Sequence, residues 1–189
     1  MKRPAVFLDR DGTLIHEIPA EKPLRNARTR FFSGTVAAVR KLNQLGFLVI
    51  IISNQPVVAR GLASEREVEE LHATMVRRLT EKGAKIDAVY FCPHHPNANL
   101  PEYRKKCLCR KPNIGMIKKA AKKFNIDLKK SFLVGDRTAD IAAGNRANIK
   151  MILVKTGCGG KDGKYEGKPD FIAKNLKAAV SIIESLTKC

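Results

Sequence analysis

The sequence predicts an α/β fold with a doubly wound, Rossmann-like parallel sheet, and two patterns support this prediction. Short apolar segments that end in polar residues recur along the chain, as expected of strands that are buried on both faces of a parallel sheet. Helical patterns lie between these segments, and strands that alternate with helices are joined by crossover connections. The expected strands are residues 5–8, 47–52, 88–91, 132–134 and 151–154.

The helical segments have recognisable ends. Ser64 and Glu67 form a capping box at the start of one helix, while Gly46 and Gly83 mark two helix ends. A polar, glycine-rich loop over residues 157–168 precedes a final strand and helix. Ligands of such sheets bind beyond the carboxyl ends of the strands, so residues that follow strands are candidates for function. The expected helices are residues 35–45, 64–82, 113–124 and 176–186.

Length and composition predict a single globular domain over residues 1–189 with loop insertions. Hydrophobic residues make up 44% of the chain and charged residues 29%. The longest apolar run, residues 47–52, is too short to span a membrane, and a charged residue interrupts the N-terminal apolar stretch before a signal peptide could form. We therefore expect a cytoplasmic monomer with no membrane partner.

The formal net charge of +18 favours anionic partners. A positive field concentrates phosphorylated substrates and also attracts nucleic acid without specificity. The alternative is a lysine-rich surface that is simply solvated. We favour this alternative, because the basic residues are dispersed and the chain has only three Tyr and no Trp on which bases could stack. No specific nucleic-acid partner is expected.

An acidic motif directly follows the first expected strand. Asp9 and Asp11 flank an arginine, and Gly12 comes next. Strand geometry would point both carboxylates the same way. Two carboxylates this close repel each other unless a cation or a shared proton intervenes, and hard oxygen ligands suit Mg²⁺. The motif is therefore either a magnesium-supported phosphate site or an Asp-rich turn that ends the strand.

Three thiols and an imidazole form a second cluster of possible metal ligands. They have the composition of a closed tetrahedral zinc site, which would stabilise the polar loop at about 92–109 and hold Arg110 and Lys111 beside it. Free cysteines or a disulfide are the alternatives, although closely spaced thiols in a cytosolic chain favour metal. His95 is an alternative imidazole ligand, and Cys158 is expected to be an ordinary thiol. The four candidate ligands of this structural Zn²⁺ are Cys92, His94, Cys107 and Cys109.

In this context the acidic motif resembles the D-x-D-x-T motif of the haloacid dehalogenase (HAD) superfamily. The other three superfamily motifs have counterparts in the same order, each at an expected strand or helix boundary. The fourth, G-D-x-x-x-D, is specific in itself. The matching residues are Asp9, Asp11 and Thr13 for the first motif, Ser53 for the second, Lys111 for the third, and Asp136 and Asp140 for the fourth.

The resemblance implies a magnesium-dependent phosphatase that forms an aspartyl phosphate. Asp9 is then the nucleophile and Asp11 the general acid and base. Mg²⁺ is held by the Asp9 carboxylate, the Asp11 backbone carbonyl and Asp136. Ser53 and Lys111 stabilise the transferred charge. Asp140, one helical turn after Asp136, supports the site.

The cysteine and histidine pattern is similar to the C-x-H…C-x-C zinc loop of the heptose 1,7-bisphosphate phosphatases and the related histidinol-phosphate phosphatases. In that family the second motif continues into an Asn-Gln loop that ends Ala-Arg-Gly. Residues 53–61 keep both ends of this loop, but Pro56 and Val57 stand where Ser-Gly is typical. The residues expected to contact a phosphorylated substrate are Thr13, Asn54, Arg60, Arg110 and Arg137.

Only about forty residues separate the first and second motifs, which is too few for a large helical cap. A small flap and the zinc loop are expected to close the site. The substrate implied by the resemblance is a small phosphorylated metabolite: D-glycero-D-manno-heptose 1,7-bisphosphate, cleaved at its 7-phosphate. Histidinol phosphate is the nearest alternative. A nucleic-acid 3′-phosphatase is a further alternative, suggested by the charge and by the use of the same acidic motif in such enzymes.

Overall fold

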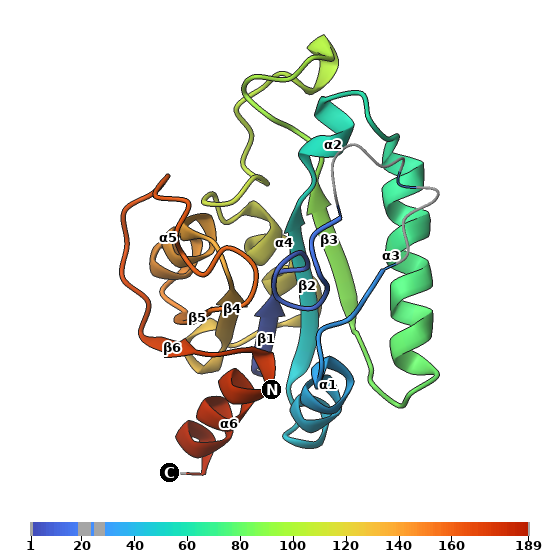
Figure 1. The fold of residues 1–189 in the computed structure, drawn as a ribbon. Helices are drawn as coiled ribbons and strands as arrows, with labels where there is room; N and C mark the ends of the chain where they lie inside the picture. Colours follow the sequence, from blue (N-terminus) through green and yellow to red (C-terminus); the bar gives the residue numbers. More distant parts are fainter. Residues whose placement is uncertain (1, 19–23, 25–28, 189) are drawn as a thin grey trace.

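A computed structural model of the protein describes residues 2–18, 24 and 29–188. Its centre is a six-stranded parallel sheet with the strand order β3-β2-β1-β4-β5-β6 (Figure 1). This confirms the predicted doubly wound α/β fold. The strands are β1 (Ala5–Leu8), β2 (Leu48–Asn54), β3 (Ala88–Cys92), β4 (Phe132–Gly135), β5 (Lys150–Val154) and β6 (Phe171–Ala173).

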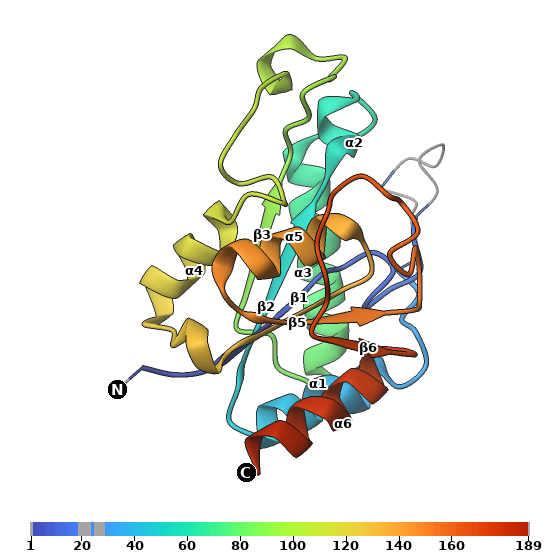
Figure 2. The same cartoon turned by 90° about the vertical axis from the view of Figure 1, so that its left-hand side faces the viewer.

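Helices cover both faces of the sheet. α1, α3 and α6 pack on one face, and α4 and α5 on the other (Figure 2). The predicted capping box is present at α3, where the Glu67 N–H donates to Ser64 Oγ over 3.2 Å and the Ser64 N–H donates to Glu67 Oε2 over 2.8 Å. The helices are α1 (Thr35–Gln44), α2 (Pro56–Ala59), α3 (Glu65–Thr80), α4 (Gly115–Phe124), α5 (Thr138–Ala147) and α6 (Leu176–Thr187).

The one-turn helix α2 was not expected. Its four residues give no helical periodicity, but Pro56 occupies a first-turn position, where its fixed φ suits a helix and its missing N–H costs no hydrogen bond. The Asn-Gln loop that follows β2 therefore turns sharply instead of continuing as an extended segment. Part of the expected flap between the first two motifs lies outside the described residues. Of the rest, Ile15 forms an antiparallel bridge with Phe31.

Strand β1 lies at the centre of the hydrophobic core. Val6 and Leu8 point into the cluster under α1 and α6, whereas Ala5 and Phe7 point into the cluster under α4. All four side chains are fully buried. Burying a large apolar side chain contributes about 1.5–3 kcal/mol, so both faces hold β1 in place. Because β1 is held on both faces, the position of the next residue, Asp9, is fixed as well.

The strand order reverses at β1, because β2 lies on one side of it and β4 on the other. The Asp9 N–H donates to the Val134 carbonyl of β4 over 2.9 Å. Asp136 directly follows β4, so Asp9 and Asp136 meet at the same edge of the sheet. This switch point is where doubly wound folds bind their ligands.

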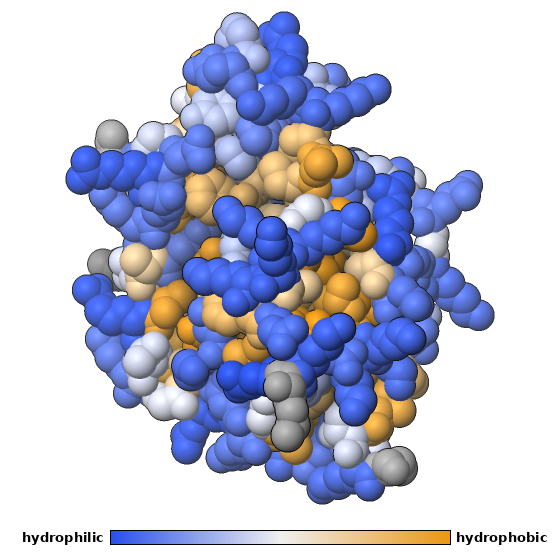
Figure 3. Space-filling view, turned by 180° about the vertical axis from the view of Figure 1, so that it is seen from behind, coloured by the Kyte–Doolittle hydropathy of each residue, from blue (hydrophilic) through white to orange (hydrophobic). Residues whose placement is uncertain are grey.

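The described part of the chain contains no helix that is long and apolar enough to cross a membrane. Hydrophilic side chains cover most of the face on which α4 lies (Figure 3). The segment between β3 and α4, which contains the predicted zinc loop, projects beyond the carboxyl end of the sheet (Figure 1).

Candidate active site

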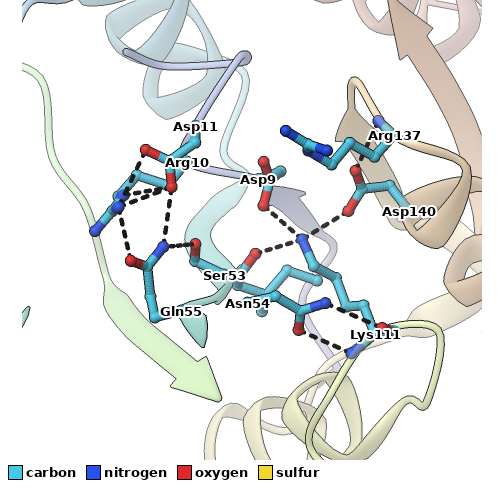
Figure 4. A network of polar contacts seen from close by, with 10 residues as sticks. Asp9, Arg10, Asp11, Ser53, Asn54, Gln55, Lys111, Arg137 and Asp140 are labelled. Carbon is cyan, nitrogen blue, oxygen red and sulfur yellow. Dashed lines mark hydrogen bonds and ion pairs between the residues drawn. The ribbon is translucent and has the colours of Figure 1, made fainter. Parts of the chain in front are cut away.

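Lys111 lies at the centre of the site (Figure 4). Its Nζ donates to Asp9 Oδ1 over 2.5 Å and to the Ile52 carbonyl over 2.8 Å, and it forms an ion pair with Asp140 Oδ1 at 2.6 Å. The side chains of Lys111, Asp9 and Asp140 are all at least nine-tenths buried. One ammonium group thus joins Asp9, which follows β1, to Ile52 in β2 and Asp140 in α5.

Burial dominates the titration of Asp9. Loss of solvent raises the pKa of Asp9 to about 7, even though the Lys111 ammonium opposes this rise. Burial alone would lower the pKa of Lys111, but the Asp140 and Asp9 carboxylates outweigh it and raise that pKa. Lys111 therefore stays charged and attracts anions.

The three acidic residues Asp9, Asp136 and Asp140 form a possible cation site, because their oxygens can lie within 4.8 Å of one another. Asp136 Oδ1 is buried without a hydrogen-bond partner in the described part of the chain. Burial first and the Asp9 charge second raise the pKa of Asp136 to about 8. A hard divalent cation would compensate this concentration of negative charge and occupy the free oxygen, so the donor set fits Mg²⁺.

Two glycines allow the chain to approach this cluster closely. A Cβ atom at Gly12 would lie 2.2 Å from Asp136 Oδ2, and one at Gly157 would lie 2.3 Å from the same oxygen. Both residues also have positive φ. The Cys158 N–H donates to Asp136 Oδ2 over 2.7 Å. Cys158 was expected to be an ordinary thiol, but its backbone amide holds the Asp136 carboxylate.

Asp11 does not point toward this cluster, so the expectation that Asp9 and Asp11 point the same way is wrong (Figure 4). Arg10 donates to both oxygens of the Asp11 carboxylate at 3.0 Å, and Gln55 Nε2 donates to Oδ2 over 2.9 Å. β1 ends at Leu8, and the chain turns directly after it. Because the strand geometry does not continue to Asp11, hydrogen bonds from Arg10 and Gln55 hold its side chain away from Asp9.

Arg10 is itself held by buried partners that the sequence did not indicate. Its Nη2 donates to Gln55 Oε1 over 2.8 Å, and its Nη1 lies 3.0 Å from His72 Nε2. Because arginine can only donate, His72 Nε2 accepts and the ring is neutral. Burial, followed by the Arg10 charge, lowers the pKa of His72 to about 3. No motif marks His72, since it comes from the buried face of α3.

Ser53 follows the strand predicted over residues 47–52 and is the penultimate residue of β2, at the edge of the site. It is nearly fully buried, and its Oγ accepts a hydrogen bond from Gln55 Nε2 over 2.8 Å. The hydroxyl hydrogen remains available to donate to a phosphate oxygen. Gln55 thus contacts both Ser53 and Asp11 with one amide nitrogen.

The predicted zinc ligands lie together. Cys109 Sγ is 2.8 Å from Cys92 Sγ and 3.2 Å from Cys107 Sγ, and His94 Nδ1 is 3.4 Å from Cys109 Sγ. Hydrogen bonds from Cys92 and the other two groups lower the pKa of Cys109 to about 5, although burial opposes this change. Three cysteine sulfurs and one imidazole nitrogen are the donor set of a structural Zn²⁺ site. His95 lies outside this group and lines the active-site cavity instead.

A cavity of about 570 Å³ opens above the buried carboxylates. Arg60, Arg110 and Arg137 all line it, as expected for an anionic ligand. Arg110 Nη1 donates to the His94 carbonyl over 3.0 Å, which ties this arginine to the zinc loop. Arg137 Nη2 donates to Glu17 Oε1 over 2.9 Å.

Two predicted substrate contacts have other positions or partners. Thr13 is fully buried and is absent from the cavity lining, so its contact with substrate stays a prediction. The turn after Asp11 directs it into the core. Asn54 lines the cavity, but its amide donates to the Lys111 carbonyl over 3.0 Å and accepts from the Lys111 N–H over 2.9 Å. Asn54 therefore positions Lys111.

The glycine-rich loop before β6 also lines the cavity, through Asp162, Lys164 and Tyr165. Asp162 accepts hydrogen bonds from the Thr138 N–H over 2.9 Å and from its hydroxyl over 2.8 Å, and so fastens the loop to the start of α5. No sequence motif marks these residues as part of the site. Only the parallel pairing of β4 and β5 places this loop beside the fourth motif.

The sequence resembles curated heptose-bisphosphate phosphatases along most of its length. It is 34% identical over 192 residues to D-glycero-β-D-manno-heptose-1,7-bisphosphate 7-phosphatase of Salmonella typhi, which covers 98% of this chain and 97% of the relative. The chain belongs to this phosphatase family. It is also 42% identical over 157 residues to the enzyme of Photorhabdus laumondii named for the α anomer, covering 82% and 85% of the two chains.

Family and structure comparisons agree with this membership. A family described as HAD-hydrolase-like matches residues 108–179. The fold is similar to a crystal structure of D,D-heptose 1,7-bisphosphate phosphatase from B. bronchiseptica complexed with magnesium and phosphate. The TM-score is 0.81 at 29% identity, and the match covers 98% of this chain and 99% of that one. The predicted HAD superfamily membership and phosphatase activity are thereby confirmed.

Proposed function

We propose that this phosphatase removes the 7-phosphate of D-glycero-D-manno-heptose 1,7-bisphosphate through a phospho-aspartate at Asp9. The observation that carries this proposal is the buried Asp9–Lys111 pair at the floor of a cavity lined by four arginines. The names of the relatives support the substrate, since members named for both anomers are similar to this chain.

The geometry gives Asp9 a reactive oxygen. Lys111 occupies Asp9 Oδ1, which leaves Oδ2 to attack phosphorus in line with the leaving oxygen. Lys111 and the Ser53 hydroxyl lie at the same strand ends, where they can donate to the transferred phosphoryl oxygens. Mg²⁺ bound by Asp9, Asp136 and the Asp11 backbone carbonyl, with Asp140 as support, would supply charge neutralisation for these oxygens.

Asp11 is the general acid that protonates the leaving alcohol, and then the base that activates water. Both oxygens of its carboxylate accept hydrogen bonds from Arg10. Asp11 must therefore rotate away from Arg10 when substrate enters. Gln55 has contacts to both Ser53 and Asp11, so phosphate binding at Ser53 would weaken the bond that holds Asp11 back.

Zn²⁺ at Cys92, His94, Cys107 and Cys109 would have a structural role, because four protein ligands leave no open coordination position. The bond from Arg110 to the His94 carbonyl links the zinc loop to the cavity. We propose that Arg110 and Arg60 bind the phosphate that is not cleaved, since both line the side of the cavity near the zinc loop.

The decisive experiment compares Mg²⁺-dependent phosphate release from four substrates. These are both anomers of the heptose bisphosphate, histidinol phosphate and a 3′-phosphorylated oligonucleotide. We expect the highest kcat/KM on a heptose anomer, and a loss of at least about a thousandfold in Asp9→Asn. Higher kcat/KM on histidinol phosphate or the oligonucleotide would contradict the substrate, and full activity of Asp9→Asn would contradict the mechanism. The single domain, monomeric state and cytoplasmic location stay predictions.

A further inference from the structure

Seven basic residues gather at the amino ends of the parallel strands, opposite the catalytic cavity. Two precede β1, two lie at the end of α4, two precede β4, and one begins β5. All seven are exposed. We call this surface the basic pole; it consists of Lys2, Arg3, Lys122, Lys123, Lys129, Lys130 and Lys150.

Backbone pairing brings these segments together. The Arg3 N–H donates to the Asn125 carbonyl over 3.1 Å, and the Asp127 N–H donates to the Arg3 carbonyl over 2.9 Å. The start of the chain thus lies beside the turn between α4 and β4 (Figure 2). Lys150 is in register with Phe132, the first residue of β4. Parallel pairing therefore places the cations of three neighbouring strands on one surface.

Basic residues outnumber the carboxylates beside this surface. One of these carboxylates is Asp170, whose Oδ2 accepts a hydrogen bond from the Met151 N–H, next to Lys150, over 2.7 Å. Between residues 103 and 161 the chain has sixteen Lys and Arg but only three Asp, and two of those, Asp136 and Asp140, are buried in the active site. The third, Asp127, accepts a hydrogen bond from the Lys129 N–H. Within the described ranges, no residue of the basic pole forms an ion pair.

The basic pole contains none of the large hydrophobic side chains that are exposed in the described part of the chain. The large hydrophobic side chains that are exposed elsewhere in the described ranges, such as Leu108 and Ile172, do not belong to it, so insertion into a membrane is not favoured. The Phe124 and Phe132 rings lie under Lys123 and Lys150. Phe132 is buried and Phe124 is partly buried, so neither presents a fully exposed ring for base stacking. The basic pole can therefore recognise a partner mainly through its positive charge.

We propose that the basic pole binds the phosphodiester backbone of nucleic acid, duplex in preference to single strand, without reading sequence. Neutralisation of closely spaced phosphates releases counterions, and a duplex has the denser charge. The strands separate this surface from the cavity; β1, with four residues, spans about 13 Å. Nucleic acid and the phosphorylated metabolite can thus be bound at the same time.

The test is fluorescence anisotropy with a labelled duplex of about 20 base pairs bearing 3′-hydroxyl ends, titrated over a range of NaCl concentrations. One combined variant removes four lysines of the basic pole (Lys122→Gln, Lys123→Gln, Lys129→Gln, Lys130→Gln). Its affinity for the duplex should fall at least about tenfold, and the slope of log affinity against log NaCl concentration should become about three units less steep. A control removes four exposed lysines elsewhere (Lys105→Gln, Lys106→Gln, Lys174→Gln, Lys177→Gln). The affinity of this control variant for the duplex should fall less than about threefold.

Several results would overturn the proposal. Equal losses in the two variants would show that net charge acts without a site, and preference for single strands would contradict the duplex. Binding to phosphatidylserine vesicles that the duplex cannot displace would assign the surface to membranes. Inhibition of phosphatase activity that follows the duplex binding curve would place the nucleic acid in the cavity. Thermal unfolding of both variants verifies that they fold.

Discussion

Lys111 determines the charge balance of the site, since it is the cation that contacts both Asp9 and Asp140 directly. The three charges are buried, so each depends on the others. Asn54 fixes the backbone on which Lys111 is mounted. A motif search can identify such a lysine, but the consequence of removing it depends on these contacts.

Replacement of Lys111 by methionine should reduce phosphatase activity by at least about a thousandfold, because the charge beside the transferred phosphoryl group is lost. The free energy of unfolding should also fall, by about 3 kcal/mol at pH 8. The loss should be smaller at pH 5, since the unpaired carboxylates then take up protons. Urea unfolding at both pH values measures this, with the exposed Lys118→Met as control. An equal loss at the two pH values would contradict the charge argument.

His72 should make the protein less stable in acid. Its pKa is about 3 in the folded protein and about 6.5 when unfolded, so only the unfolded chain binds the proton between these values. Stability is therefore unaffected above pH 6.5 and falls as the pH drops below it. His72→Gln keeps an acceptor for Arg10 but cannot titrate. Between pH 7 and 5 it should lose about 2 kcal/mol less than wild type in urea unfolding.

A suitable control is His16→Gln, which removes a ring that stacks on Phe32 and is not bonded to Arg10. This variant should keep the acid dependence of the wild type. If His72→Gln and wild type lose stability in parallel between pH 7 and 5, His72 is not the group responsible.

At the scale of elements, two loops complete the active site that forms at the carboxyl ends of the strands. The glycine-rich loop before β6 donates to Asp136 and lines the cavity, while the zinc loop between β3 and α4 holds Arg110. Neither loop has an apolar pattern that would fix its conformation. Close packing holds the first loop, and metal coordination is proposed for the second.

The glycine-rich loop offers a matched pair of substitutions. Gly157 and Gly163 both have positive φ, at 61° and 56°, so alanine strains the backbone similarly at each. Only at Gly157 does the new Cβ collide with Asp136; at Gly163 no heavy atom lies within 4 Å. We expect Gly157→Ala to lower kcat/KM by about a hundredfold and Gly163→Ala to have little effect. Similar activities of the two variants would show that the close approach is unimportant.

The zinc loop should depend on its metal. Purified protein should contain about one zinc per chain by elemental analysis, and Cys109→Ser should lose most of it. Limited proteolysis should then cleave between β3 and α4. Cys158→Ser serves as a control, because Cys158 lies outside the ligand group, and it should keep its zinc. Retention of metal by Cys109→Ser would refute the assignment.

The whole molecule combines a positive net charge with an acidic cluster at the sheet edge. Such a field accelerates the encounter with an anionic substrate. We expect kcat/KM for the heptose bisphosphate to fall several-fold as NaCl rises, with kcat unchanged. A substrate with one phosphate should show a weaker dependence. A fall in kcat of the same size would instead indicate an effect of salt on chemistry.

Residue order was sufficient to determine the fold class and most of the chemistry. Buried strands such as β1 and β2 consist of apolar runs, and the carboxyl ends of parallel strands share one edge, so residues after those runs had to meet. This is why Asp9, Ser53 and Asp136 were predictable. The zinc ligands were predictable for a different reason, because thiols and imidazoles at short spacing form a donor set by themselves.

Only the tertiary structure decided which side chains turn away from the site and which unmarked residues join it. Asp11 lies against Arg10, and Thr13 is in the core, because the chain turns immediately after β1. His72 and Cys158 reach the site through a helix face and a backbone amide, neither of which leaves a motif. The direction of a side chain after a turn and contacts between distant segments depend on packing in three dimensions, and residue order alone does not specify them.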